Sequence, residues 1–400
     1  MKNFLFIFIL FNSLFIYSQN SGLYKFEDAS GKYGFIDKSG NIIIDPEYLW
    51  VSDFNDGRAF VSKENGTYGR KWICIDTLGN KIFDLGNNWM KEDFSEGFAV
   101  VQFQDEYWFI DKEGNKAFNK TYADVRSGFK QGYAIVSDEK FKNFYYIDKK
   151  GKKCEKLPSG HITIFNKNGY AVNFDNGYYV TDTLGNKIGE KQTIINGSSE
   201  GLFKVQKNNK WGFMNISGTI AVDYLYDEDE RNYSSNEDSP KKKLKKSGLK
   251  NVSLFHEGLA SFQRDSLYGF IDKTGKIVIE PQFKGIGWFS EGLAGASLDG
   301  KLWGFIDETG KFILNPIYYK TDAFEKNICA VRIHYVEWEM ANDYYFDAII
   351  DKLGNILNKV EMHCYLGFNN DLIEYYGGPH FTGGVHYLNN KAEHIVPKKL

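Results

Sequence analysis

Residues 268–279 read YGFIDKTGKIVI, two apolar runs on either side of the short turn sequence Asp-Lys-Thr-Gly. An aspartate at the first position of a turn accepts hydrogen bonds from the backbone that follows it, and a glycine at the fourth position tolerates a positive φ. The flanking runs are rich in β-branched and aromatic residues, which favour strands. The stretch therefore predicts a β-hairpin whose turn runs from Asp272 to Gly275.

The same turn recurs along the chain. Asp or Asn is followed three residues later by Gly at residues 37–40, 76–79, 111–114, 148–151, 182–185, 215–218, 272–275, 307–310 and 351–354. Successive copies begin 33 to 39 residues apart, except for two wider gaps of 57 and 44 residues. Near-constant spacing of this kind is typical of tandem repeats, so the chain is expected to form one repeat array rather than separate domains.

A second marker follows five of these turns: an aromatic residue and, three residues later, Gly-x-Ala and an apolar run. It begins at Phe54, Phe94, Phe129, Phe255 and Phe289. This run supplies a third strand, so the unit is predicted to be a three-stranded antiparallel meander with an irregular link. Proline at positions 46, 281 and 316 is expected to end the second strand, because proline cannot donate to a ladder.

One such unit cannot bury its apolar face alone, so neighbouring units must stack into a continuous core. The sequence predicts an all-β array of about nine or ten units, elongated or spiral. A closed β-propeller is the alternative, although propeller blades usually have four strands. The 42% hydrophobic and 17% aromatic composition, with 40 glycines, suits many short strands joined by tight turns.

Several first strands resemble the WG (KWG) repeat of bacterial proteins. The resemblance rests on residues 33–37 (YGFID), 210–213 (KWGF), 268–272 (YGFID) and 302–307 (LWGFID), and it extends from about Gly31 to beyond Gly354. It implies a repeat scaffold with binding roles and no catalytic residues. Some units lack the glycine after the aromatic residue and are expected to pack differently, namely those with Trp108-Phe109, Tyr145-Tyr146 and Tyr178-Tyr179.

The ends and the wide gaps depart from the repeat. Lys2, the apolar stretch 4–16 and the polar residues after it predict a signal peptide over residues 1–18, with an uncleaved anchor as the alternative. The protein is thus expected to be exported to the periplasm, cell surface or extracellular space. The array is expected to span residues 19–358, with a degenerate repeat or cap over 359–400. Residues 227–250 form an acidic-then-basic insertion that accounts for the 57-residue gap, and an extended hairpin around residues 335–345 explains the other.

No signature of catalysis or metal binding emerges. The recurrent aspartates share one turn position, whereas a catalytic carboxylate pair needs two unlike environments. The four cysteines lack paired spacing, and the late histidines match no compact metal motif. We expect no enzyme, cofactor or metal. A net charge of −3 gives no overall attraction for nucleic acid. For a carbohydrate-active enzyme, the alternative, the candidate acids are Glu337, Glu339 and Asp343.

Tryptophans divide into two groups. Trp72, Trp108, Trp211 and Trp303 stand at the repeating first-strand position and are expected to pack between units. Those outside that register are candidate surface binding residues: Trp50, Trp89, Trp288 and Trp338. The sequence therefore predicts a non-catalytic scaffold that binds a protein or polysaccharide partner at the cell envelope. A purely structural spacer is a further alternative.

Overall fold

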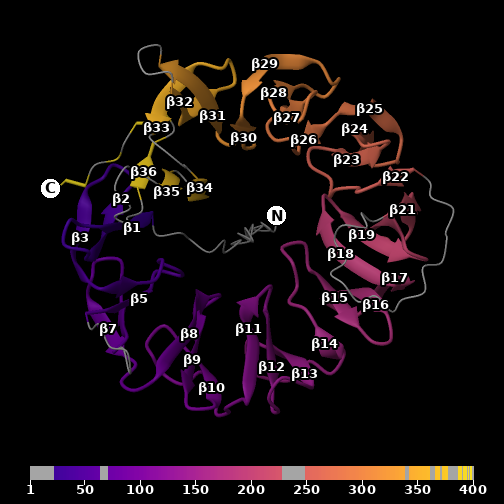
Figure 1. Ribbon diagram of the computed structural model, residues 1–400. Helices are drawn as coiled ribbons and strands as arrows, with labels where there is room; N and C mark the ends of the chain where they lie inside the picture. The colour runs from indigo at the N-terminus through magenta and orange to yellow at the C-terminus, as the bar shows by residue number, and fades with distance from the viewer. Residues whose placement is uncertain are drawn as a thin grey trace, which may run out of the picture.

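The computed structural model describes residues 22–63, 71–227, 248–337, 342–360, 365–369, 372–376, 386–389, 391–393, 395, 397 and 398. Within these ranges the regular elements are strands, and they form small antiparallel sheets arranged in a ring (Figure 1). The predicted all-β tandem array is confirmed. The predicted signal peptide and residues 228–247 of the charged insertion lie outside the described residues.

The strands follow the repeat closely, and we number the units 1 to 10 along the chain. Units 1 to 5 contain β1 (Leu23–Glu27), β2 (Tyr33–Asp37) and β3 (Ile42–Tyr48); β4 (Trp50–Val51), β5 (Ala59–Ser62), β6 (Ile73–Ile75) and β7 (Lys81–Asp84); β8 (Trp89–Ser95), β9 (Phe98–Phe103) and β10 (Glu106–Ile110); β11 (Asp124–Lys130), β12 (Tyr133–Ser137) and β13 (Phe144–Asp148); and β14 (Ser159–Ile162), β15 (Tyr170–Phe174), β16 (Tyr178–Asp182) and β17 (Lys187–Gln192).

Units 6 to 10 continue in the same order. They contain β18 (Ile194–Ser199), β19 (Leu202–Lys207), β20 (Lys210–Asn215) and β21 (Ile220–Tyr226); β22 (Leu249–Lys250), β23 (Leu259–Arg264), β24 (Leu267–Asp272) and β25 (Ile277–Phe283); β26 (Gly285–Ile286), β27 (Ala294–Ser297), β28 (Trp303–Ile306) and β29 (Phe312–Tyr318); β30 (Lys320–Thr321), β31 (Ile328–Glu337), β32 (Asn342–Asp351) and β33 (Ile356–Val360); and β34 (Tyr365–Asn369), β35 (Leu372–Tyr376) and β36 (His386–Leu388).

Most units gain a strand beyond the expected three-stranded meander. Five of the described sheets have four strands in chain order, because the link before the Gly-x-Ala marker forms a short first strand such as β26. That strand lies toward the centre of the ring and the last strand lies outside, as β26 and β29 do (Figure 1). One seven-stranded sheet, β11 to β17, joins units 4 and 5, so the nine sheets of the described chain represent ten units.

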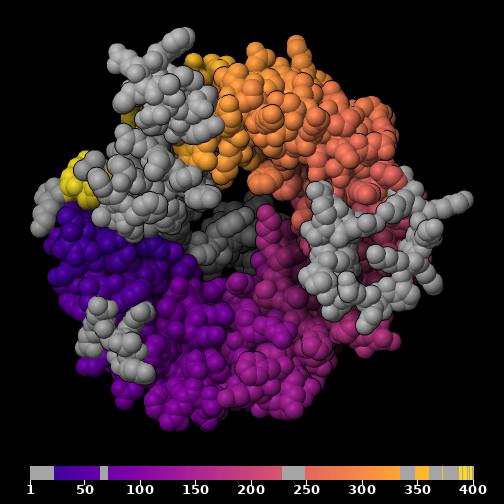
Figure 2. Space-filling model, in the orientation of Figure 1, coloured from indigo at the N-terminus to yellow at the C-terminus, as the bar shows by residue number. Residues whose placement is uncertain are grey.

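The array closes on itself, so the propeller-like alternative is the arrangement observed. The backbone N–H of Lys398 donates to the carbonyl of Gly40 at 2.8 Å, and the N–H of Ile42 donates to the carbonyl of Lys398 at 2.9 Å. Ile395 packs with Tyr24 and other buried residues of unit 1. The C-terminal residues therefore cover the face of the first unit, and the ring surrounds a central opening (Figure 2).

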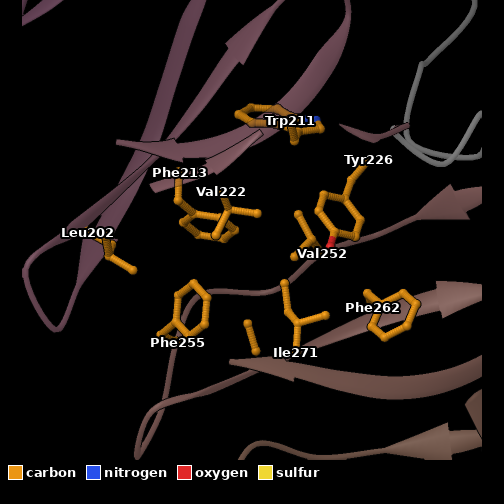
Figure 3. Close-up of a cluster of buried hydrophobic side chains, with 10 residues drawn as sticks. Leu202, Trp211, Phe213, Val222, Tyr226, Val252, Phe255, Phe262 and Ile271 are labelled. Atoms are coloured by element: carbon orange, nitrogen blue, oxygen red, sulfur yellow. The ribbon is translucent and has the colours of Figure 1, made fainter. Parts of the chain in front are cut away.

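The core lies between units, as stacking requires. One cluster combines Trp211, Phe213 and Tyr226 of unit 6 with Phe255 and Phe262 of unit 7 (Figure 3). The rings of Phe213 and Phe255 meet edge to face with centroids 4.8 Å apart. Because each cluster draws on two neighbours, a unit depends for its stability on the units beside it.

The repeated Asp-x-x-Gly turn has the predicted geometry. Asp307 Oδ1 accepts hydrogen bonds from Thr309 Oγ1 at 2.6 Å, Thr309 N at 2.9 Å and Lys311 N at 3.1 Å. The hydroxyl bond from Thr309, reinforced by the two amides, lowers the pKa of Asp307 despite slight burial. Gly310 adopts φ of 85°. These aspartates thus shape turns, as the sequence indicated.

The glycine of the aromatic-Gly pair permits a close approach of the last strand. A Cβ built on Gly304 would lie 2.4 Å from the carbonyl oxygen of Leu314. The register shifts at this point because β29 carries a bulge around Pro316. The equivalent pairings of β2 with β3, β20 with β21 and β24 with β25 show the same shifts. Contrary to expectation, proline lies within this strand, at the bulge, where no ladder donor is needed.

The expected long hairpin is also present. Strands β31 and β32 pair without a register shift from Ile328 opposite Asp351 to Glu337 opposite Asn342. Ten residues on each strand account for the 44-residue gap. The wider spacing therefore reflects a lengthened hairpin within unit 9.

We predict that removing residues 394–400 destabilises the ring. The truncation deletes the two backbone hydrogen bonds at Lys398 and the packing of Ile395, which together contribute about 3–5 kcal/mol. The melting temperature should fall by several degrees in circular dichroism or calorimetry. A variant ending at Lys398 is the control and should melt like the full chain; equal melting of the two truncations would show that this contact does not close the ring.

We also predict that Gly304→Ala lowers the free energy of unfolding by about 3 kcal/mol, since the new methyl group collides with backbone that cannot move aside. Gly287→Ala is the matched control, because its Cβ would meet its nearest neighbours at an ordinary 3.5 Å. Urea denaturation of the two variants measures the difference. Comparable stability of both would contradict the close-approach role of the repeat glycine.

Candidate functional site

The ring has two ends that differ in their loops. In an antiparallel unit, the turn after the first strand and the Asp-x-x-Gly turn after the third strand lie at the same end. We call this end the turn face. The link between the second and third strands lies at the opposite end, which we call the hairpin face. The two faces use their polar and aromatic residues differently.

On the turn face, an acidic side chain reaches from each of several units to the backbone of the next. Glu257 accepts hydrogen bonds from the amides of Glu291 at 2.6 Å and Gly292 at 2.8 Å, and Glu291 accepts one from Asn327 at 2.8 Å. The same bond joins Asp56 to Gly97, Glu96 to Gly132 and Glu200 to Gly258, at 2.7, 2.9 and 3.0 Å. These acids therefore lock neighbouring units together.

Serine and lysine extend this lock. Ser290 Oγ donates to the carbonyl of Phe324 at 2.6 Å, and Ser95 Oγ donates to that of Phe129 at 2.7 Å. Lys352 Nζ lies 3.1 Å from Glu291 Oε2. The signal was visible in the sequence as an acid directly before the marker glycine, but sequence reasoning did not assign it a role. The carboxylates of these acids therefore serve the contacts between units.

The hairpin face carries exposed aromatic side chains in three successive units. Phe141 stands in the link between the second and third strands of unit 4, and Phe103 and Phe174 stand directly before the corresponding links of units 3 and 5, with 83%, 42% and 42% of their surface exposed. The corresponding links of units 6 and 7 carry only polar residues at their tips: Asn208, Asn209, Asp265 and Ser266. Exposed phenylalanines of this kind make this face a candidate interaction surface.

Polar contacts connect these three links. Lys140 Nζ, next to Phe141, lies 2.7 Å from Asp105 in the link of unit 3. Toward unit 5, the guanidinium carbon of Arg126 lies 3.9 Å above the centroid of the Phe144 ring. Arg126 Nη1 also donates to the carbonyl of Ile162 at 3.1 Å. The aromatic residues therefore belong to one continuous rim of the ring.

A pocket of about 360 Å³ opens where units 4 and 5 meet. Its lining consists of Arg126, His161, Ile162, Thr163, Val172, Asn173, Phe174 and Tyr178. The Phe174 ring lies 5.0 Å from that of Tyr178 and 6.0 Å from that of His161, in both cases edge to face. The pocket thus combines three aromatic rings with an exposed guanidinium.

The pocket arises where the repeat departs from its pattern. Tyr145 and Tyr179 occupy the position of the repeat glycine, three residues before the turn aspartate, and in unit 4 Tyr145 lies opposite Ser159 of β14. Strand β14, the first strand of unit 5, pairs with both β13 and β15. As expected from the sequence, these units pack differently, and sequence reasoning missed the pocket because it depends on that altered pairing.

The tryptophans predicted to bind a partner do not lie on one face of the ring where the structure describes them. Trp50 and Trp89 are 41% and 45% exposed and lie opposite Ser62 and Gln102, at the hairpin-face ends of the first strands of units 2 and 3. Trp288 is 55% exposed on the turn face, where its ring centroid lies 5.8 Å from that of His256. Trp338 lies outside the described residues. Two of the four therefore join the aromatic rim.

The remaining expectations from the sequence concern the tryptophans at the repeating position and the cysteines. Trp72 and Trp211 are buried, and Trp108 and Trp303 are half-buried, as predicted for the repeating position. Cys74, Cys154 and Cys329 are unpaired. Burial raises the pKa of the Cys74 thiol to about 12.

The side chains of the candidate acids of the alternative enzyme lie outside the described part of the structure. Glu339 is outside the described residues, and Glu337 and Asp343 are placed only as backbone positions of β31 and β32. Across the described ranges, no three His, Cys, Asp or Glu side chains gather as a metal site. No helix within those ranges is long and apolar enough to cross a membrane.

The architecture defines a class of protein: a closed ring of tandem antiparallel sheets round a central opening, as in β-propellers. Residues 33–68, 268–301 and 303–335 match the family model of the WG containing repeat. The chain therefore contains the WG repeat at these three positions, and each matched segment begins at an aromatic-Gly pair.

Solved structures resemble the chain over most of its length at low identity. A eukaryotic initiation factor shares 10% identity over 93% of this chain and 94% of its own, with a TM-score of 0.45. BamB from Moraxella catarrhalis shares 9% over 80% and 93%, with a TM-score of 0.29. The C-terminal WD40 domain of Sif2 shares 8% over 82% and 88%, with a TM-score of 0.30. No curated protein matches the sequence.

We predict that Glu257→Ala weakens the contact between units 7 and 8. The amides of Glu291 and Gly292 lose their acceptor, which should lower the free energy of unfolding by about 1–2 kcal/mol. Chemical denaturation measures the change. Glu308→Ala, which removes an exposed acid in a turn of unit 8, is the control and should be neutral. An equally small effect of both substitutions would rule out a locking role.

Proposed function

We propose that this WG-repeat protein is a non-catalytic scaffold that binds a protein or polysaccharide partner at the bacterial cell envelope. The binding surface would be the hairpin face of units 2 to 5. The observation that carries the proposal is the continuous rim of exposed aromatic side chains on that face: Trp50, Trp89, Phe103, Phe141 and Phe174. Soluble proteins rarely expose such a set without an interaction that uses it.

The distribution of side chains supports binding rather than a uniform spacer. A spacer needs the locks between units but has no use for aromatic residues in solvent. Here the exposed phenylalanines gather in units 3 to 5, whereas the same links in units 6 and 7 are polar at their tips. The unevenness favours a partner that covers part of the ring.

Strain at one of these residues supports the same view. Phe141 adopts φ of 62°, a left-handed conformation that bulky residues seldom take. Its amide donates to Asp124 Oδ2 at 3.2 Å, which helps to hold the link in place. A phenylalanine that is 83% exposed in a strained turn contributes nothing to the core. Its position is instead that of an anchor for a partner.

The envelope location rests on the predicted signal peptide, and the absence of a general charge attraction for nucleic acid follows from the net charge of −3. Export would place the ring among envelope proteins and polysaccharides. Aromatic side chains suit both kinds of partner, because rings stack on sugar faces and also act as protein hot spots.

We predict that Trp50→Ala/Trp89→Ala reduces partner binding at least tenfold without unfolding the ring. The chain from Gln19 would be used in pull-downs from envelope extract and on a polysaccharide array, with folding checked by circular dichroism. Trp288→Ala and Trp338→Ala, tested separately, report on the other two predicted tryptophans.

Leu78→Ala/Leu353→Ala is the matched control, since these leucines are 74% and 80% exposed in turns on the turn face. It should bind like the wild type. If the two double variants lose binding equally, the hairpin face is not the binding surface. If the wild-type chain captures no partner in either format, the spacer alternative takes the place of the scaffold.

A further inference from the structure

We propose that the pocket between units 4 and 5 binds an acidic sugar residue of an anionic polysaccharide. The inference rests on the proposed scaffold function and specifies its ligand. The Arg126 guanidinium would pair with the sugar carboxylate, and the rings of Phe174 and Tyr178 would contact the C–H faces of the sugar. The pocket residues supply both kinds of contact on one short stretch of rim.

Arg126 is oriented but has no acidic partner in the described chain. Its guanidinium lies against Phe144 and donates one bond to the carbonyl of Ile162, so its position is fixed. By contrast, Arg332 contacts both oxygens of Asp347, at 2.8 and 3.0 Å, and Arg264 contacts Glu280 at 2.6 Å. An exposed guanidinium held in place without a carboxylate is suited to bind one from a ligand.

The remaining polar groups of the pocket select for an acceptor-rich ligand. Thr163 Oγ1 already donates to the carbonyl of Val172 at 2.9 Å and accepts from its amide at 3.0 Å. Asn173 is buried and donates to Thr181 Oγ1 at 2.9 Å. The side-chain donors left to a ligand are thus Arg126, the exposed His161 and the hydroxyl of Tyr178. The guanidinium among them favours a carboxylate over a neutral sugar.

The walls of the pocket combine three aromatic rings with the aliphatic side chains of Ile162 and Val172. Phe174 is 42% exposed, and the edge-to-face contacts with Tyr178 and His161 set the three rings at steep angles to one another. Rings arranged in this way present flat apolar faces beside polar groups. A pyranose has the same mixture, with C–H faces and polar edges.

The size and position of the pocket favour one sugar residue of a longer polysaccharide chain as the ligand. Its volume of about 360 Å³ is near the lower end of the range for ligand pockets, roughly 300–1,000 Å³. Phe141 and Phe103 continue the rim on the side of unit 3, and the contact of Lys140 with Asp105 joins their links. A polymer anchored in the pocket could therefore extend along these rings.

The test is binding of the chain from Gln19 to a panel of glycans that contain uronic or sialic acids, printed beside their carboxyl-reduced counterparts. Arg126→Gln and Phe174→Ala should each weaken binding at least tenfold. Arg264→Gln removes a half-buried arginine of unit 7 that is already paired with Glu280, and it should leave binding unchanged. Binding should also weaken as salt increases, because it depends on an ion pair near the surface.

Equal binding of acidic and carboxyl-reduced glycans, or full binding by Arg126→Gln, would overturn the proposal. So would the absence of binding to every acidic glycan, or binding of single-stranded oligonucleotides alone through the same residues. If another partner is still captured in a manner sensitive to Trp50→Ala/Trp89→Ala, only this inference fails. If no partner is captured at all, the scaffold function fails with it.

Discussion

Burial of one unit's apolar face against the next is the interaction on which the whole ring depends. A sheet of three or four short strands has too little core of its own, and the buried clusters accordingly draw on neighbouring units. An open array would leave such a face uncovered at each end. Closure removes both ends, because Ile395 and Lys398 reach the first unit where a preceding repeat would otherwise stand. The ring is thus a consequence of the same burial that stacks its units.

The sequence was sufficient for the local elements and for the class of fold. Asp-x-x-Gly turns carry their own geometry in two residue types, and the lengthened hairpin of unit 9 was evident from spacing alone. The additional strand of each four-stranded unit could not be predicted, because first strands such as β26 have only two residues and no alternating pattern. Closure of the ring could not be predicted from local sequence patterns either. It depends on small rotations that accumulate over ten units and on a contact between the two ends of the chain.

The candidate site was predictable only in part, for a related reason. Trp50, Trp89 and Trp288 could be assigned to the surface because they fall outside the repeating register. Phe141 and Phe174 could not be distinguished from buried phenylalanines, since exposure at a link depends on its exact turn. The pocket required knowledge that β14 pairs with both β13 and β15. The structural effect of a departure from the repeat pattern becomes evident only in the three-dimensional structure.

The two faces of the ring therefore separate the structural contacts from the proposed binding surface. On the turn face, Glu257 and Glu291 must keep their places, because each holds the backbone of the following unit. Among the described links of the hairpin face no comparable contact recurs from unit to unit, so their side chains are free to differ. Aromatic residues and an unpaired guanidinium occupy that face where the repeat pattern is weakest. A repeat protein can acquire a specific surface in this way, by relaxing its pattern at one end of a few units while the other end preserves the ring.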